Sequence, residues 1–170
     1  MVGCLIAELY VEPLGLEEIF QRYRSELNAE LRAIIGKSPL PLYRMLRYHL
    51  GWGDQEGNAS KGGGGKALRP ILCLLACEAV GGNYRQAMPV AAALELIHNF
   101  SLIHDDIEDR GCERHHRPTL WTIWGEPQAL NAGDAMHALA HLALWRLEER
   151  AVPASKILRA GRLLDNACLL

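Results

Sequence analysis

The stretch from Met88 to roughly Asp109 is rich in alanine and leucine, and it predicts a helix more clearly than any other part of the sequence. It runs into the string HDDIEDRG, in which four acidic residues occupy five consecutive positions. Carboxylates this close together repel one another. The chain must therefore fold so that this helix end either lies in water or holds a cation.

The rest of the sequence also predicts helices. Apolar side chains recur at helical spacing in segments 14–35, 40–50, 129–150 and 155–170, and one more helix begins within ALRPILCLLACEAVGG and ends at its two glycines. No run of alternating β-branched residues predicts a strand. We therefore expect an all-α fold, a bundle of helices.

Length and composition fit one domain over residues 1–170, because 49% hydrophobic content is enough for a sizeable core. One interruption is the string GWGDQEGNASKGGGG, residues 51–65, which is too rich in glycine and polar residues to pack and predicts a flexible loop. The last segment, 155–170, predicts an exposed, partly apolar helix. Either a partner covers this helix, or the chain stops short of a complete fold.

The overall charge and the ends of the chain favour a cytoplasmic protein. With 20 acidic and 18 basic residues, bulk charge gives no reason to expect a nucleic-acid partner. The N-terminus lacks a basic region and reaches Glu8 too early for a secretory signal, and no apolar run approaches the roughly 20 residues of a membrane span. An odd number of cysteines, 5, suits a reducing compartment.

The acidic string could hold a divalent cation. On a helix Asp105 and Asp109 lie about 40° apart and one turn from each other, and Asp106 lies about 100° to the side. Such a cluster suits Mg²⁺, which takes further ligands from substrate phosphates. A solvated helix end is the alternative, whereas a calcium-binding EF-hand fails because Ile107 and His116 occupy positions that need oxygen ligands.

Cationic groups flank the acidic string in the sequence. His98 lies seven residues before Asp105 on the same helix face, although a packed core histidine is the alternative. Lys66 and Arg69 lie three residues apart at a helix start and could clamp a diphosphate, or they could belong to a plain linker. The surrounding glycines do not make a P-loop, since Ala67 replaces the Ser or Thr.

A second basic cluster follows the acids in the string RHHRPT, residues 114–119. Cys112 and His115 do not predict a zinc site, because no matching second pair of ligands exists. Arginines beside a metal-binding acidic cluster suit a substrate that carries a diphosphate, since the metal neutralises one side of the phosphates and arginine binds the other.

Together the strings GGKALRP, ELIHNFSLIHDDIED, RHHRPT and NAGDAM resemble the trans-type isoprenyl diphosphate synthases, the polyprenyl synthetase family, from roughly Gly65 to Leu170. The resemblance implies a helical bundle of the isoprenoid synthase type whose cavity holds two diphosphates. It assigns the residues as follows: Asp105, Asp106 and Asp109 to Mg²⁺ and the allylic diphosphate, Lys66, Arg69 and His98 to isopentenyl diphosphate, and Arg114 to the allylic diphosphate.

Two residues depart from the family string RRGxPT. His115 replaces the second arginine, which in the family helps to bind isopentenyl diphosphate, and His116 replaces the glycine. Because the charge of an imidazole depends on pH near neutrality, we hypothesise that isopentenyl diphosphate binds more weakly than in the family and better at lower pH.

The implied reaction is a Mg²⁺-dependent condensation of isopentenyl diphosphate with an allylic diphosphate. In the family the fifth residue before the first aspartate tends to limit product length. Here that residue is Phe100, beside the small Ser101, which suggests a medium-chain product, farnesyl or geranylgeranyl diphosphate. The alternative for Phe100 is simple core packing.

The resemblance covers only the first half of the family's length, because family members carry a second aspartate-rich motif. Asp134 and Asp165 are isolated and cannot supply that motif. We therefore expect either a fragment of a prenyltransferase, a non-catalytic subunit that pairs with a full-length synthase, or a vestigial helical domain. A homodimer is expected from the family, with a heterodimer as the alternative.

Overall fold

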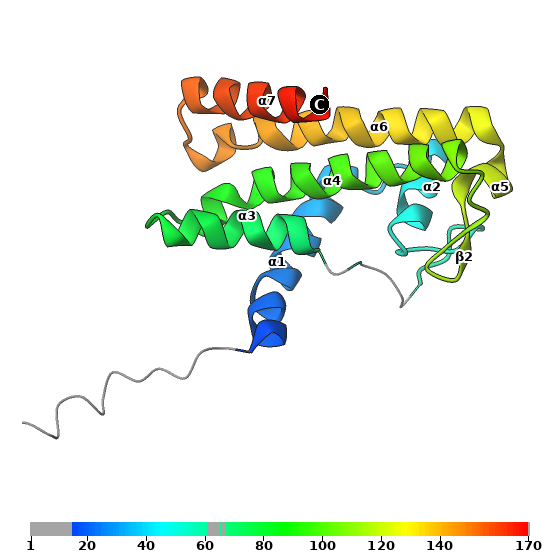
Figure 1. Ribbon diagram of the computed structural model, residues 1–170, viewed down its shortest axis with the longest axis horizontal. Coiled ribbons are helices and arrows are strands. Elements are labelled where there is room, and N and C mark those ends of the chain that lie inside the picture. Colours follow the sequence, from blue (N-terminus) through cyan, green and yellow to red (C-terminus); the bar gives the residue numbers. More distant parts are fainter. Residues whose placement is uncertain (1–14, 61–64, 66, 170) are drawn as a thin grey trace, which may run out of the picture.

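The computed structural model describes residues 15–60, 65 and 67–169, and Figure 1 shows the arrangement of its helices. The helices are α1 (Leu16–Ile35), α2 (Pro41–His49), α3 (Leu68–Ala79), α4 (Tyr84–Glu108), α5 (Leu120–Trp124), α6 (Glu126–Trp145) and α7 (Ala154–Cys168), with a 3₁₀ turn at Glu148–Arg150. The expected all-α fold is confirmed. A two-stranded antiparallel hairpin, β1 (Glu113–Arg114) and β2 (Arg117–Pro118), was not predicted.

Helix α4 lies at the centre of the fold. In Figure 1, α3, α4, α6 and α7 run roughly along one direction, and α1 crosses them. The buried side chains of α4 include three consecutive alanines, Ala91, Ala92 and Ala93, and α6 contributes Ala132, Ala140 and Ala143. Small side chains let helices approach closely, so α4 is covered on most of its circumference.

Helix α4 begins four residues earlier than the sequence predicted. Its start is set by Asn83, whose side chain accepts a hydrogen bond from the backbone N–H of Arg85 at 3.0 Å. Asparagine is a favoured N-cap because this bond satisfies a backbone donor that the first turn leaves unpaired. Pro89 lies inside the helix, near its start, and is buried. The apolar periodicity of the sequence begins only at Met88, so it does not reveal that the helix starts after Asn83.

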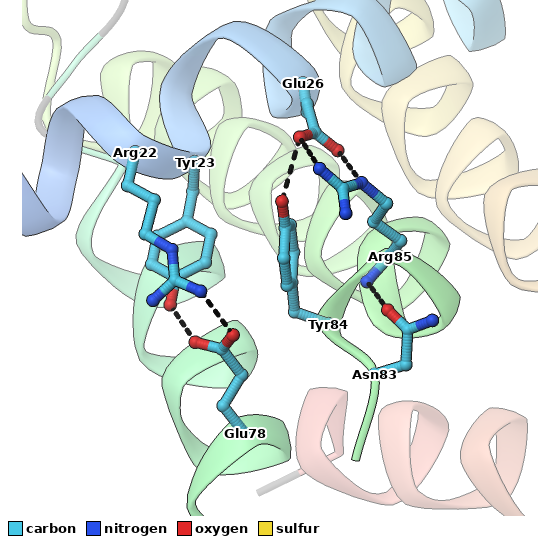
Figure 2. Close-up of polar contacts among 7 residues, drawn as sticks. All are labelled: Arg22, Tyr23, Glu26, Glu78, Asn83, Tyr84 and Arg85. Atoms are coloured by element: carbon cyan, nitrogen blue, oxygen red, sulfur yellow. Dashed lines mark hydrogen bonds and ion pairs between the residues drawn. The ribbon is translucent and has the colours of Figure 1, made fainter.

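Polar contacts fasten helix α1 to α3 and to the start of α4 (Figure 2). Arg22 forms an ion pair with Glu78 at 2.7 Å, and the hydroxyl of Tyr23 donates to the same carboxylate. One turn along, Glu26 accepts hydrogen bonds from the side chains of Arg85 and Tyr84. Burial and the adjacent Glu78 carboxylate raise the pKa of Tyr23 to about 12, so its hydroxyl stays protonated and donates.

A second set of ion pairs fastens α1 one turn beyond Glu26, close to the first set. The carboxylate of Glu30 is buried and accepts hydrogen bonds from Arg146 at 2.8 Å and Arg150 at 2.9 Å. A buried carboxylate is costly unless it is paired, and here both of its oxygens are bound by guanidinium groups. Helix α1 is thereby held against the end of α6 as well as against α3.

The prediction that residues 51–65 do not pack is wrong for the start of that segment. Trp52 is only 8% exposed, and the guanidinium of Arg32 stacks over its ring at 4.4 Å. Gly53 pairs with Ala59 in an isolated β-bridge and accepts a hydrogen bond from Arg117. Composition alone did not reveal that one tryptophan could anchor a glycine-rich segment; residues 61–64 lie outside the described part.

Helix α7 packs along α6 and leaves much of its apolar surface exposed, as the sequence predicted. Leu158 and Leu163 are 66% and 62% exposed, whereas Leu164 is buried. His141 of α6 and Asp165 of α7 join the two helices, with 2.6 Å between Nε2 and Oδ1. No helix in the described part of the chain is both long and apolar enough to cross a membrane.

The bond between His141 and Asp165 makes stability depend on pH. The hydrogen bond to the carboxylate raises the pKa of His141 above its usual 6.5. Because the folded-state value is the higher one, the stabilisation is complete below pH 6.5 and is lost as the pH rises through the raised value. Asp165→Asn should therefore lower the melting temperature more at about pH 6 than at about pH 8. An equal loss at both pH values, measured by circular dichroism, would contradict this account.

Candidate functional site

A cavity of about 370 Å³ lies between α1, the end of α2, α4 and the β1–β2 hairpin. It contains several of the predicted site residues. Those from α4 and the hairpin are His98, Asp106, Arg114 and His115. Residues of α1 and of the end of α2 line the same cavity as these residues, although they lie about 50 or more positions earlier in the sequence.

Arg69 and His98 face each other beside this cavity. The Nη1 atom of Arg69 lies 3.2 Å from Nε2 of His98. Since the guanidinium can only donate, Nε2 must accept, which places the imidazole proton on Nδ1. Burial, followed by the positive charges of Arg69 and Arg114, lowers the pKa of His98. His98 is thus a neutral imidazole in the physiological range, and the positive charge of the pair belongs to Arg69.

The carboxylate of Asp106 is fully engaged by Arg114. Arg114 Nη2 donates to Oδ1 at 2.8 Å, and Arg114 Nε lies 3.0 and 3.1 Å from Oδ1 and Oδ2. Asp106 is 6% exposed, so this is a nearly buried pair of opposite charges. A buried carboxylate without a partner would be strongly unfavourable, so the pair is held together. Its directional hydrogen bonds fix the orientation of the Arg114 guanidinium.

The three aspartates expected to hold a metal do not converge on one point. Asp105 and Asp109 are exposed at the end of α4, whereas Asp106 turns inward to Arg114. Within the ranges that the structure describes, no three His, Cys, Asp or Glu side chains are grouped so that they could hold a metal ion. The 100° step along the helix is the reason, since it separates Asp106 from the face that the other two share.

The β1–β2 hairpin carries two residues with left-handed backbone conformation. Its two loop residues, His115 and His116, have φ values of 51° and 59°. Two positive φ values are typical of a type I′ turn, which favours Asn-Gly. The strands are two residues long and the loop lacks that pair, so the sequence contained no hairpin signal. The positive φ also explains why a glycine suits position 116.

Arg117 fixes the base of the hairpin. It donates to the backbone carbonyl of Tyr48 at 2.9 Å and to that of Gly53 at 2.7 Å, and its guanidinium stacks over the Tyr48 ring at 3.9 Å. The Tyr48 hydroxyl in turn donates to the carbonyl of Pro118. Of the basic cluster predicted from the sequence, Arg117 thus joins the hairpin to α2 and the start of the loop.

Sequence reasoning missed His49, which lines the cavity from the end of α2. Burial, followed by the charge of Arg114, lowers its pKa to about 3, and it shares a hydrogen bond with the side chain of Asn99. Asn99 also donates to the carbonyl of Glu95, whose own pKa is raised by burial. Nothing near His49 in the sequence marks it, because only the fold brings α2 next to α4.

The two residues predicted to limit product length do not line this cavity. Phe100 packs edge-on against the rings of His104 and His137, with centroids 4.7 and 5.1 Å away. Ser101 donates its hydroxyl proton to the carbonyl of His98. The role of Phe100 and Ser101 in product length stays a prediction. Lys66 lies outside the described residues.

Fold and site together define a helical protein whose cavity, lined by arginine and imidazole groups, lies at the acidic end of its central helix. Residues 55–166 match the family model for polyprenyl synthetase. A (2E,6E)-farnesyl diphosphate synthase of Mycobacterium bovis is 51% identical over 100 residues, which cover 59% of this chain and 28% of that protein. A geranylgeranyl diphosphate synthase of Mycobacterium tuberculosis is 39% identical over 151 residues, or 89% of this chain and 42% of that protein.

The crystal structure of a polyprenyl synthetase from Streptomyces coelicolor A3(2) has the same fold, with a TM-score of 0.81 at 38% identity over 90% of this chain and 44% of that one. This chain belongs to the polyprenyl synthetase family, as its motifs predicted. It spans less than half the length of each of these relatives.

Replacing His116 with glycine should stabilise the fold. A residue with a side chain at φ 59° costs about 1 kcal/mol relative to glycine, which adopts this conformation without strain. His116→Gly should therefore raise the urea midpoint of unfolding. His116→Ala is the matched control, since it removes the imidazole but keeps the strained backbone, and it should give no gain. If alanine stabilised the chain as much as glycine, the backbone would not be the cause.

Proposed function

We propose that the protein is a Mg²⁺-dependent prenyltransferase that condenses isopentenyl diphosphate with an allylic diphosphate. One observation carries the proposal: the pair Arg69–His98 and the pair Arg114–Asp106 adjoin one cavity, directly beside the exposed carboxylates of α4. This cavity offers charged and neutral hydrogen-bonding groups to phosphates, and the carboxylates offer oxygen ligands to a cation.

Asp105 and Asp109 fit Mg²⁺ better than Asp106 does. Both are exposed and lie one turn apart on one helix face, and Mg²⁺ commonly takes one or two carboxylates together with waters and substrate phosphates. Asp106 has its two oxygens bound by Arg114, so we assign it to orienting that arginine. When bound, the metal would supply charge neutralisation to the departing pyrophosphate.

The residues of the chain would bind and orient the two diphosphates. Arg69 would bind one diphosphate, with neutral His98 supporting its guanidinium, and Lys66 belongs to the same proposed site. Arg114, held by Asp106, would face the other diphosphate. The allylic C–O bond then breaks, pyrophosphate leaves with the bonding electrons, the isopentenyl double bond attacks the allylic cation, and a proton is lost.

A medium-chain product, farnesyl or geranylgeranyl diphosphate, is part of the proposal. The similar proteins from Mycobacterium bovis and Mycobacterium tuberculosis are named farnesyl and geranylgeranyl diphosphate synthases, which supports this range. Phe100 is our candidate for limiting chain length. A cytoplasmic location and a homodimer also belong to the proposal, on the strength of the family resemblance.

A second candidate is a non-catalytic subunit that binds a diphosphate and pairs with a full-length synthase. One observation favours it: large apolar side chains are exposed on several helices. These side chains are Leu68, Leu72, Leu142, Trp145, Leu158 and Leu163. A partner that completes the bundle would cover some of them.

An assay with radiolabelled isopentenyl diphosphate, geranyl or farnesyl diphosphate and Mg²⁺ distinguishes the two candidates. Formation of longer prenyl diphosphates by the chain, abolished by a chelator, would support the enzyme. Binding of a pyrophosphate analogue without turnover would support the subunit. Absence of both binding and turnover would overturn both candidates.

The metal assignment predicts unequal effects at the end of α4. Asp105→Asn and Asp109→Asn should each raise the Mg²⁺ concentration for half-maximal pyrophosphate binding by at least about tenfold, because each removes a ligand. Glu108→Gln is the matched control, since it removes one charge from the same helix end and should have little effect. Titration calorimetry at several Mg²⁺ concentrations measures the difference, and equal effects of all three variants would refute the assignment.

Because His115 replaces an arginine of the family string, restoring arginine should increase the affinity for isopentenyl diphosphate. His115→Arg should lower the Michaelis constant for isopentenyl diphosphate severalfold, because a permanent charge and a fork of donors return to the cavity wall. His115→Gln leaves the same backbone conformation, with φ at 51°, and should not lower it. An unchanged Michaelis constant in the arginine variant would remove position 115 from the substrate site.

A further inference from the structure

The cavity has a wall that lies outside the part of the chain matched by the family model. The match covers residues 55–166, which include α4 and the hairpin. Helix α1 precedes the match, yet it lines the cavity with Arg24, Leu27 and Asn28. Arg24 and Asn28 lie one turn apart, so both present polar groups from the same helix face.

Arg24 differs from the other arginines around it. Among the residues that the structure describes, its guanidinium forms no ion pair, hydrogen bond or stacking contact; the residue is partly buried, but its side-chain nitrogens reach solvent. On the same helix Arg22 pairs with Glu78 and Arg32 stacks over Trp52. In the cavity Arg114 is bound to Asp106. A guanidinium that reaches a cavity without a protein partner keeps its donors available to an anionic ligand.

The position of Arg24 is fixed by its neighbours on α1. Tyr23, immediately before it, is fully buried and bound to Glu78, and Glu26, two residues later, is bound to Arg85 and Tyr84 (Figure 2). These contacts set the rotation of α1 about its axis. The face that carries Arg24 and Asn28 is therefore held toward the cavity rather than swinging into solvent.

The charges in the cavity favour an anion next to Arg24. Outside α1, the cavity is lined by His98 and His115, and by Arg114 and Arg117. Its acidic members are Glu95 and Asp106; burial raises the pKa of Glu95, and Arg114 neutralises Asp106. A planar guanidinium binds two phosphate oxygens at once, and the amide of Asn28 can donate a further hydrogen bond.

We propose that Arg24 is a diphosphate-binding residue of this cavity, supported by Asn28, and that it binds the phosphates from α1 while His98 and Arg114 contact them from α4 and the hairpin. The inference rests on the proposed function for the nature of the ligand. It adds a contact from a helix that precedes the family match, and it gives the cavity a cationic group on α1 as well as those on the hairpin.

The test is calorimetric titration of the chain with inorganic pyrophosphate. Arg24→Gln should weaken binding by about tenfold or more and leave the melting temperature unchanged, because Arg24 holds no partner in the described structure. Arg24→Lys should recover only part of the affinity, since lysine keeps the charge but loses the fork. Arg159→Gln, which removes the same charge from the exposed surface of α7, should bind like the wild type.

The outcomes separate this inference from the proposed function. Wild-type affinity in Arg24→Gln, together with weakened binding in Arg114→Gln, would overturn the role of Arg24 and leave the cavity as a diphosphate site. Equal losses in Arg24→Gln and Arg159→Gln would overturn it too, because bulk charge would then be the cause. If the wild-type chain bound no pyrophosphate with or without Mg²⁺, the proposed function itself would fail.

Discussion

The close packing of helix α4 is the constraint on which the other elements depend. A run of alanines lets α3, α6 and part of α1 surround it, and few of its residues reach solvent before the acidic end. At Gly133 of α6, the imidazole of His104 from α4 occupies the space that a Cβ would need. A helix held this firmly gives its polar residues fixed directions, which a site for small charged ligands requires.

The residues of the acidic string have two different environments, because successive residues of a helix are rotated by about 100°. Asp105 and Asp109 stay exposed, whereas Asp106 is buried against Arg114 and orients it. Four carboxylates in five positions are tolerable because one of them is neutralised by a guanidinium and the others are solvated. The site thus consists of paired groups. Asp106 orients Arg114, and Arg69 lies against the neutral imidazole of His98.

The sequence predicted the helices and the family well, because apolar periodicity and ordered motifs are local signals. It failed where tertiary contacts decide the outcome. The hairpin at 113–118 forms without a turn signal, since Arg117 binds the carbonyls of Tyr48 and Gly53. His49 joins the cavity only because the end of α2 reaches Asn99 of α4. The inward turn of Asp106 follows from the helical angle, but its partner could be identified only once the hairpin was placed.

The hydrogen bonds around the cavity differ in how much chain they enclose, and this suggests an order of assembly. Arg114 and Asp106 are 8 residues apart, and the bond from Trp121 to Gly111 spans 10. The contacts of α1 with Glu78 and with Arg150 span 56 and 120 residues. Contacts between near neighbours lose less chain entropy on closing, so the corner formed by α4 and the hairpin can organise first. The wall that carries Arg24 is instead fixed by contacts that close the long loops, so its placement depends on most of the chain having folded.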